Sequence, residues 1–226
     1  MQVFFISFRE GNCESNWQRC KELHPTSIRI HGVKGISRAH MICEELAETE
    51  YYWTIDGDNW LTEKLRVREI PEADMTLFKT IDPLWDNETT LGSVKLWRKG
   101  TIVNKDMSKG DFTLNATTSR KTNQRVVSIS KYNEVPFDAW KTSFRHCVKM
   151  LTCIFNHNPE YYRIDHYLSQ WKNSKNSTAI NSNWAYQGYL DAEEYSKIYD
   201  NNLTELNKIN DYDWLENYYK SKYENN

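Results

Sequence analysis

The chain has 226 residues, enough for one medium-sized domain with a full hydrophobic core. Aromatic residues make up 14% of it and the formal net charge is −2, which argues against disorder and gives no general reason to bind nucleic acid. The five cysteines form no Cys-x-x-Cys pair, so we expect reduced thiols in a cytoplasmic protein. The N-terminus has no basic or long apolar stretch, so we expect neither a signal peptide nor a membrane span.

The first third of the chain alternates between strand and helix patterns. Short apolar runs at residues 3–8, 27–30 and 51–55 predict strands. Between them, residues 12–23 and 36–48 carry apolar side chains at three- and four-residue spacing, which predicts helices. This alternation is typical of β-α-β units with a parallel sheet, whose ligands bind beyond the carboxyl ends of the strands.

The middle of the chain is less regular. Residues 75–81, 93–97 and 126–130 resemble strands, with a polar, turn-rich loop expected at 82–90. Residues 99–124 are poor in apolar side chains, and we expect a flexible excursion there.

A helix is predicted from Pro136, because apolar residues follow it at helical spacing up to Leu151. Further helices are expected at 162–171, 186–199, 203–209 and 213–223, with no strand after residue 160. The predicted fold class is therefore α/β: one domain with a mostly parallel central sheet flanked by helices, plus a helical C-terminal extension. We place the catalytic core at residues 1–158 and the extension at 159–226.

Asp56-Gly57-Asp58 follows the third predicted strand directly. Two carboxylates one residue apart repel each other, and a divalent cation would offset them; Mg²⁺ and Mn²⁺ are often held by one or two carboxylates plus substrate phosphates. The alternative is an ordinary exposed Asp-Gly turn. Asp56 and Asp58 are thus candidate metal ligands.

The segment from His31 to Gly35 links the second strand to the second helix. Its glycines, Gly32 and Gly35, allow close approach to a ligand, and the following helix would direct its first amides at a phosphate. Lys34 and Arg38 add positive charge. A tight turn with a surface lysine is the alternative.

An anion-binding turn beside a pair of metal-binding carboxylates is what a nucleoside-diphosphate sugar donor requires, because the metal would neutralise the diphosphate as the sugar departs. The acceptor hydroxyl would then need a general base if transfer inverts the sugar. The candidates lie in residues 133–140, around the start of the helix that begins at Pro136. Asp138 is one, although an acid in a first turn is often only a helix-terminal charge. Arg145 could hold a phosphate or carboxylate, and His146 could transfer a proton.

Ordered blocks along the chain resemble one known family. These blocks are Phe-Phe-Ile-Ser near the start, Ile-His-Gly-Val-Lys-Gly-Ile, Ala-Glu-Thr-Glu-Tyr-Tyr, Asp-Gly-Asp-Asn, Gly-Ser-Val-Lys-Leu-Trp from Gly92, Pro-Phe-Asp-Ala-Trp with Phe-Arg, and Ile-Asn-Asp-Tyr-Asp-Trp-Leu from Ile209. The set resembles phage-encoded glycosyltransferases of the GT-A fold that are associated with TET/JBP-type pyrimidine hydroxylases.

The resemblance implies a GT-A-like fold, a UDP-sugar donor (UDP-glucose is expected), Mn²⁺ or Mg²⁺, and double-stranded DNA with 5-hydroxymethylpyrimidines as acceptor. The donor would contact His31, Gly32, Lys34, Gly35, Arg38, Asp56 and Lys95. The family pattern has Glu after Phe-Arg where this chain has His146, so Asp138 and His146 are alternatives for the base. Transfer to a polysaccharide or protein, or binding without catalysis, are the other readings.

A DNA acceptor requires basic residues along its path. The best cluster lies in the predicted excursion; it consists of Lys105, Lys109, Arg120, Lys121 and Arg125. A solvated loop would have the same composition.

Overall fold

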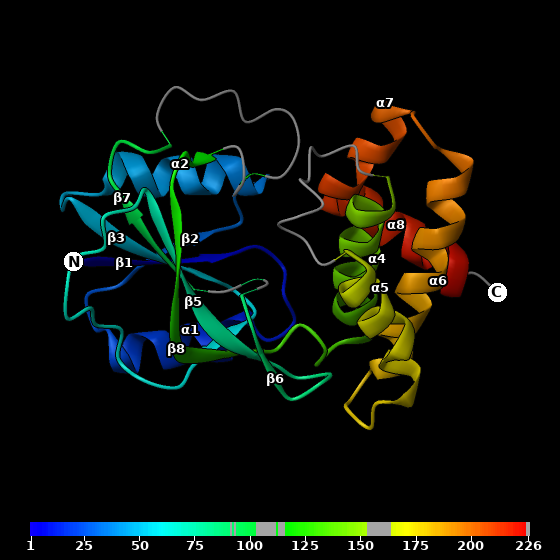
Figure 1. Ribbon diagram of the computed structural model, residues 1–226, viewed down its shortest axis with the longest axis horizontal. Helices are drawn as coiled ribbons and strands as arrows, with labels where there is room; N and C mark the ends of the chain where they lie inside the picture. The colour runs from blue at the N-terminus through cyan, green and yellow to red at the C-terminus, as the bar shows by residue number, and fades with distance from the viewer. Residues whose placement is uncertain (91, 93, 103–111, 113–115, 153–163, 225–226) are drawn as a thin grey trace. The chain divides into compact units, whose positions relative to one another are not determined.

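A computed structural model describes residues 1–90, 92, 94–102, 112, 116–152 and 164–224 (Figure 1). The chain divides into two compact units, Met1–Tyr132 and Asn133–Asn226. This division falls earlier than the boundary at 158/159 that we expected, because the helix from Pro136 groups with the C-terminal helices. That residues 1–158 form the catalytic core stays a prediction.

The N-terminal unit is built on one sheet in the order β2-β1-β3-β7-β5-β8-β4, with β6 paired to β5. The pairings β1–β2, β1–β3 and β5–β8 are parallel, and β7 is antiparallel to both β3 and β5. Five strands therefore run in one direction, and β7, β4 and β6 oppose them. The bounds are β1 Gln2–Ser7, β2 Ile28–His31, β3 Tyr51–Asp56, β4 Asn59–Leu61, β5 Met75–Asp82, β6 Asn87–Thr89, β7 Lys95–Arg98 and β8 Arg120–Ser130.

Among the elements that the structure describes in full, α1 covers one face of this sheet and α2 the other (Figure 1). Helix α1, Cys13–Leu23, packs Cys20 with Phe5, Trp53 and Ile55, whereas α2, Ile36–Leu46, packs Cys43 with Phe4 and other residues of the opposite face. Because both faces of β3 are covered, its apolar run is nearly continuous. The predicted mostly parallel α/β sheet flanked by helices is confirmed.

The C-terminal unit is helical in the residues that the structure describes. The long helices α4 and α6 pack so closely that a Cβ at Gly188 would collide with the Trp140 carbonyl. Trp140 also donates its indole N–H to buried Asp191 at 2.7 Å. The bounds are α4 Pro136–Thr152, α5 Ile164–Asn173, η1 Ser174–Asn176, α6 Ser182–Ile198, α7 Leu203–Leu206, η2 Asn207–Asn210 and α8 Tyr212–Tyr223.

Two local expectations need correction, and one short strand was missed. The expected loop at 82–90 contains β6, which forms a hairpin with β5. Strand β8 begins at Arg120 and not at 126, because polar residues at a sheet margin pair through their backbone without an apolar signature. Strand β4 has only three residues and was not predicted.

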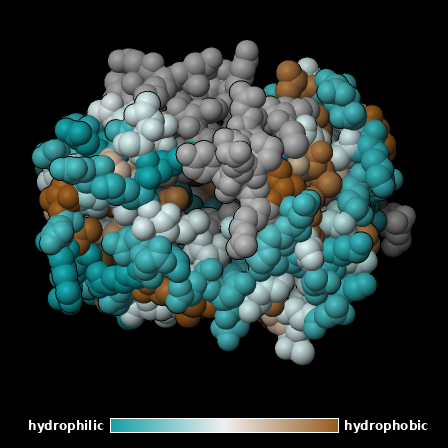
Figure 2. Space-filling view, viewed as in Figure 1, coloured by the Kyte–Doolittle hydropathy of each residue, from teal (hydrophilic) through white to brown (hydrophobic). Residues whose placement is uncertain are grey.

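Other features of the chain agree with its composition. Cys13, Cys20, Cys43 and Cys147 are buried free thiols, as expected. None of the helices in the described ranges combines the length and apolarity needed to cross a bilayer. The face shown in Figure 2 is mostly hydrophilic, with hydrophobic residues scattered over it.

Candidate active site

The Asp56–Asp58 turn and the His31–Gly35 turn lie at the same edge of the sheet. Strand β1 lies between β2 and β3, with Ser7 opposite His31 and Ile6 opposite Asp56. All three strands run in parallel, so their carboxyl ends meet at one edge, where ligands of parallel sheets bind. The sequence predicted this convergence.

Asp56 already has a positive partner. Lys95, at the start of β7, places Nζ 2.8 Å from Oδ2 of Asp56, and both side chains are largely withdrawn from solvent. The other oxygen, Oδ1, is buried and accepts no hydrogen bond from the described part of the chain. The charge at Asp56 is thus offset by an internal lysine, while one oxygen stays available to a ligand.

Asp58 is held by its neighbour Asn59. The buried Asn59 amide donates to Asp58 Oδ1 at 2.9 Å and to the Gly92 carbonyl at 2.8 Å, while its own oxygen accepts from Ser128. The Asp58 main-chain carbonyl accepts from Lys131 N–H at 2.7 Å. These bonds join the turn to β8 and fix the direction of the carboxylate.

A third carboxylate, Glu10, packs against the turn. A Cβ on Gly57 would lie 2.7 Å from Glu10 Oε2 and 3.0 Å from Ser7 Cβ, so a larger residue here would have to displace the Glu10 side chain. Sequence reasoning missed Glu10. Its place just after β1, at the same carboxyl edge, is the signal that points to it.

The residues present fit a divalent ion that completes its shell with ligand phosphate. Among the described residues, no group of three His, Cys, Asp or Glu side chains is arranged to hold a metal alone. Asp58, together with the unbonded oxygen of Asp56, supplies the one or two carboxylates that Mg²⁺ and Mn²⁺ commonly take from protein in nucleotide sites.

The turn before α2 has the geometry of an anion site. Gly32 and Gly35 have φ of +72° and +88°, values that other residues rarely adopt, and a Cβ at either would meet nothing within 4 Å. Gly35 is the N-cap of α2, and no N-cap side chain accepts a hydrogen bond from the first helical amides. Lys34 is exposed in this turn. Arg38 instead pairs with Glu45, further along the helix, at 3.5 Å.

Two buried ionisable groups lie near these carboxylates. His40 of α2 is buried against Trp97 and Phe112, and burial, aided by the charge of Lys95, lowers its pKa to about 3. At the end of β5, burial raises the pKa of Asp82 to about 6, although Tyr132 donates to both of its oxygens at 2.9 and 3.0 Å. Sequence reasoning identified neither as perturbed, because burial depends on tertiary packing.

The three residues predicted to take part in catalysis are engaged within the C-terminal unit. Asp138 is buried and pairs with Lys141 at 2.6 Å. Arg145 donates to the Ile209 carbonyl at 2.7 Å and to Tyr212. His146 accepts the Trp171 indole N–H at Nδ1, at 2.8 Å. The Asp138–Lys141 pair lies within α4, whereas the contacts of Arg145 and His146 join α4 to other helices. The catalytic roles of the three residues stay predictions.

The described basic residues lie far along β8 from the carboxylates. Arg120 and Lys121 begin the strand, whereas its last residue, Ser130, pairs with Asn59 beside Asp58. An 11-residue strand spans about 30 Å, so these cations mark the opposite edge of the sheet. Arg125 pairs with Glu63. Lys105 and Lys109 lie outside the described residues.

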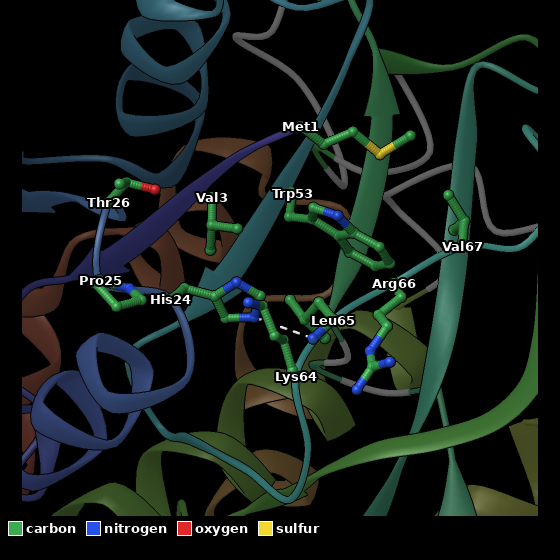
Figure 3. A pocket seen from close by; sticks show the side chains of 10 residues that line it. All are labelled: Met1, Val3, His24, Pro25, Thr26, Trp53, Lys64, Leu65, Arg66 and Val67. Carbon is green, nitrogen blue, oxygen red and sulfur yellow. Dashed lines mark hydrogen bonds between the residues drawn. The ribbon is translucent and has the colours of Figure 1, made fainter.

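A cavity of about 400 Å³ lies at that amino edge (Figure 3). Its wall includes Val3, Trp53, Lys64 and Arg66, and His24 accepts the Leu65 N–H at 3.0 Å. It is separate from the carboxyl-edge turns that carry the predicted site residues.

No family of known proteins and no curated protein matches the sequence. Solved structures with some similarity include glycosyltransferases. A mannosyltransferase, PcManGT from Pyrobaculum calidifontis, in complex with GDP-Man and Mn²⁺, has a TM-score of 0.48 at 9% identity, covering 100% of this chain and 88% of that one. Residues 1–349 of S. aureus TarS give 0.39 at 12% identity, covering 99% and 93%.

A glycosyltransferase involved in glycosylation of the major capsid of PBCV-1 gives a TM-score of 0.32 at 16% identity, covering 45% of this chain. The match spans only 62% of that protein. At these values the comparisons assign neither a donor nor an acceptor to this chain.

Proposed function

We propose that the protein is a metal-dependent glycosyltransferase with a GT-A-like fold that uses a UDP-sugar, with UDP-glucose as the expected donor. The observation that carries the proposal is the meeting of Asp56 and Asp58 with the uncapped N-terminus of α2 at one sheet edge. Carboxylates for a cation beside amides for an anion suit a metal-bound diphosphate. The ordered sequence blocks support the same reading.

In this proposal Asp58 and Oδ1 of Asp56 hold Mn²⁺ or Mg²⁺, and Lys95 keeps Asp56 in place. A bound divalent ion supplies charge neutralisation for the departing diphosphate. The α2 amides and Lys34 bind phosphate oxygens, with His31, Gly32 and Gly35 shaping the turn. Arg38 would have to leave Glu45 to take part.

The proposed acceptor is the hydroxyl of 5-hydroxymethylpyrimidines in double-stranded DNA, and its support is the sequence resemblance. Asp138 or His146 would take the hydroxyl proton. For Asp138 this requires that its carboxylate exchange Lys141 for the acceptor. For His146 the available atom is Nε2, because Nδ1 accepts from Trp171.

A second candidate keeps the enzyme class and changes the acceptor to a polysaccharide or protein. The position of Arg120 and Lys121 at the amino edge favours it, because these cations do not lead toward Asp58. A binding module without turnover is the third candidate, motivated by His146 in place of the family's Glu.

The test is mass spectrometry of hydroxymethylated duplex DNA after incubation with the protein, Mn²⁺ and a panel of nucleotide sugars, with glycan and protein acceptors in parallel. With UDP-glucose as the donor, we expect the mass of the DNA to increase by that of one hexose residue for each base modified. Faster transfer to the glycan or protein acceptors would show that one of these, and not DNA, is the acceptor. Donor binding with neither transfer nor hydrolysis would contradict the enzyme assignment.

A further inference from the structure

Four polar side chains form a continuous hydrogen-bonded row on the α1 side of the candidate site. Glu14 of α1 accepts two bonds from the Arg29 guanidinium, at 2.6 and 2.9 Å. Arg29 Nε donates to Ser7 Oγ at 3.0 Å. Ser7 Oγ lies 2.9 Å from His31 Nδ1. The row ends at the first residue of the His31–Gly35 turn.

The direction of the Ser7–His31 bond follows from its neighbours. A guanidinium only donates, so Ser7 Oγ accepts from Arg29 and its own proton needs an acceptor. Ser7 is 2% exposed, and leaving a buried hydroxyl proton unpaired is unfavourable. Within the described residues, Nδ1 of His31 is the acceptor in reach. His31 therefore carries its proton on Nε2.

His31 lies at the edge of the sheet that carries the candidate site. His31 is exposed, and its backbone leads through Gly32 into the α2 N-terminus. Ser7 of β1 is opposite His31 of β2. Asp56 of β3 is opposite Ile6, so the next residue, Gly57, lies beside Ser7. The three positions therefore form a line across β2, β1 and the end of β3. Two strand spacings make about 10 Å, a span that a nucleoside diphosphate can bridge.

We propose that Ser7 and Arg29 are positioning residues that hold His31 in its Nε2–H tautomer, so that it donates one hydrogen bond to a phosphate oxygen of a nucleoside diphosphate. The ligand half of this inference rests on the proposed function, whereas the tautomer does not. Glu14 contributes by fixing the Arg29 guanidinium through two bonds.

Long-range ¹⁵N–¹H NMR of the imidazole rings tests the tautomer, with His31→Gln identifying the signal. In the unmodified protein at pH 8 we expect a protonated Nε2 and an unprotonated Nδ1. Ser7→Ala should give a mixture of tautomers, whereas Ser15→Ala, which removes an exposed hydroxyl from α1, should leave the signal unchanged. A protonated Nδ1 in the unmodified protein would overturn the proposal, and this measurement requires no variant. An unchanged tautomer in a folded Ser7→Ala variant would also overturn it.

Titration with UDP and Mn²⁺ tests the ligand. We expect His31→Gln to weaken UDP binding by about tenfold, the size of one hydrogen bond to a charged group, with a smaller loss in Ser7→Ala and none in Ser15→Ala. Equal UDP affinity in His31→Gln would overturn the ligand half. Failure of the unmodified protein to bind UDP, with the tautomer as expected, would instead contradict the proposed function.

Discussion

Lys95 and Asp56 form an ion pair across β7 and β3, with 2.8 Å between Nζ and Oδ2. Lys95 is opposite Thr54 in the antiparallel register, so Asp56 is its diagonal neighbour on the same face of the sheet. The sequence suggested that a cation must offset the two aspartates, and for Asp56 that cation is a residue of the chain. The proposed metal site therefore depends chiefly on Asp58.

Replacing Lys95 by Met should destabilise the protein by about 2 kcal/mol, between the values for exposed and buried pairs, because it leaves a mostly buried carboxylate without its partner. Urea unfolding measures the change. Lys79→Met removes the more exposed pair with Glu88 and should change the free energy of unfolding by less than about 1 kcal/mol. Equal losses in the two variants would show that the Lys95–Asp56 pair has no special role.

Gly57→Ala should destabilise the turn by about 1–3 kcal/mol, because the new Cβ would overlap Glu10 Oε2 and crowd Ser7. We expect the same variant to weaken Mn²⁺ binding by displacing the flanking carboxylates. Adding Glu10→Ala should recover part of the stability. No recovery in the double variant would place the conflict elsewhere in the turn.

Asp82 should make stability fall as pH rises. Its folded pKa of about 6 exceeds the unfolded value near 3.8, so the contribution is complete below pH 3.8 and is lost as pH passes through 6. The loss from pH 4 to 7 is about 2 kcal/mol relative to Asp82→Asn. Unfolding of both proteins at each pH isolates this group from His40, whose lowered pKa acts in the opposite direction. Parallel pH profiles would contradict the assignment.

Most of the N-terminal fold was predictable because its signals are local. Alternating strand and helix periods located β1, α1, β2, α2 and β3, and the parallel arrangement then placed Asp56 and His31 at one edge. The margins of the sheet were not predictable in this way. β4 and the first half of β8 are held by backbone pairing, which leaves little trace in side-chain pattern.

The partners of the site residues required three dimensions. Nothing in the sequence links Lys95 to Asp56, or Arg29 to Ser7, because both pairs form through strand register. Arg145 has the composition of an anion-binding residue, yet the structure engages its guanidinium with the Ile209 carbonyl and Tyr212. Residue type suggested the chemistry, and tertiary contacts determine which groups are available for it.

The most direct test of the account is Mn²⁺-dependent release of UDP from UDP-glucose, compared between the unmodified protein and Asp58→Asn. Asp200→Asn, a change at an exposed aspartate of the C-terminal unit, is the matched control. We predict release by the unmodified protein and the control, and a loss of at least about 100-fold in Asp58→Asn, since even residues behind a metal ligand matter by 10–100-fold. Undiminished, metal-dependent release by a folded Asp58→Asn would contradict the account.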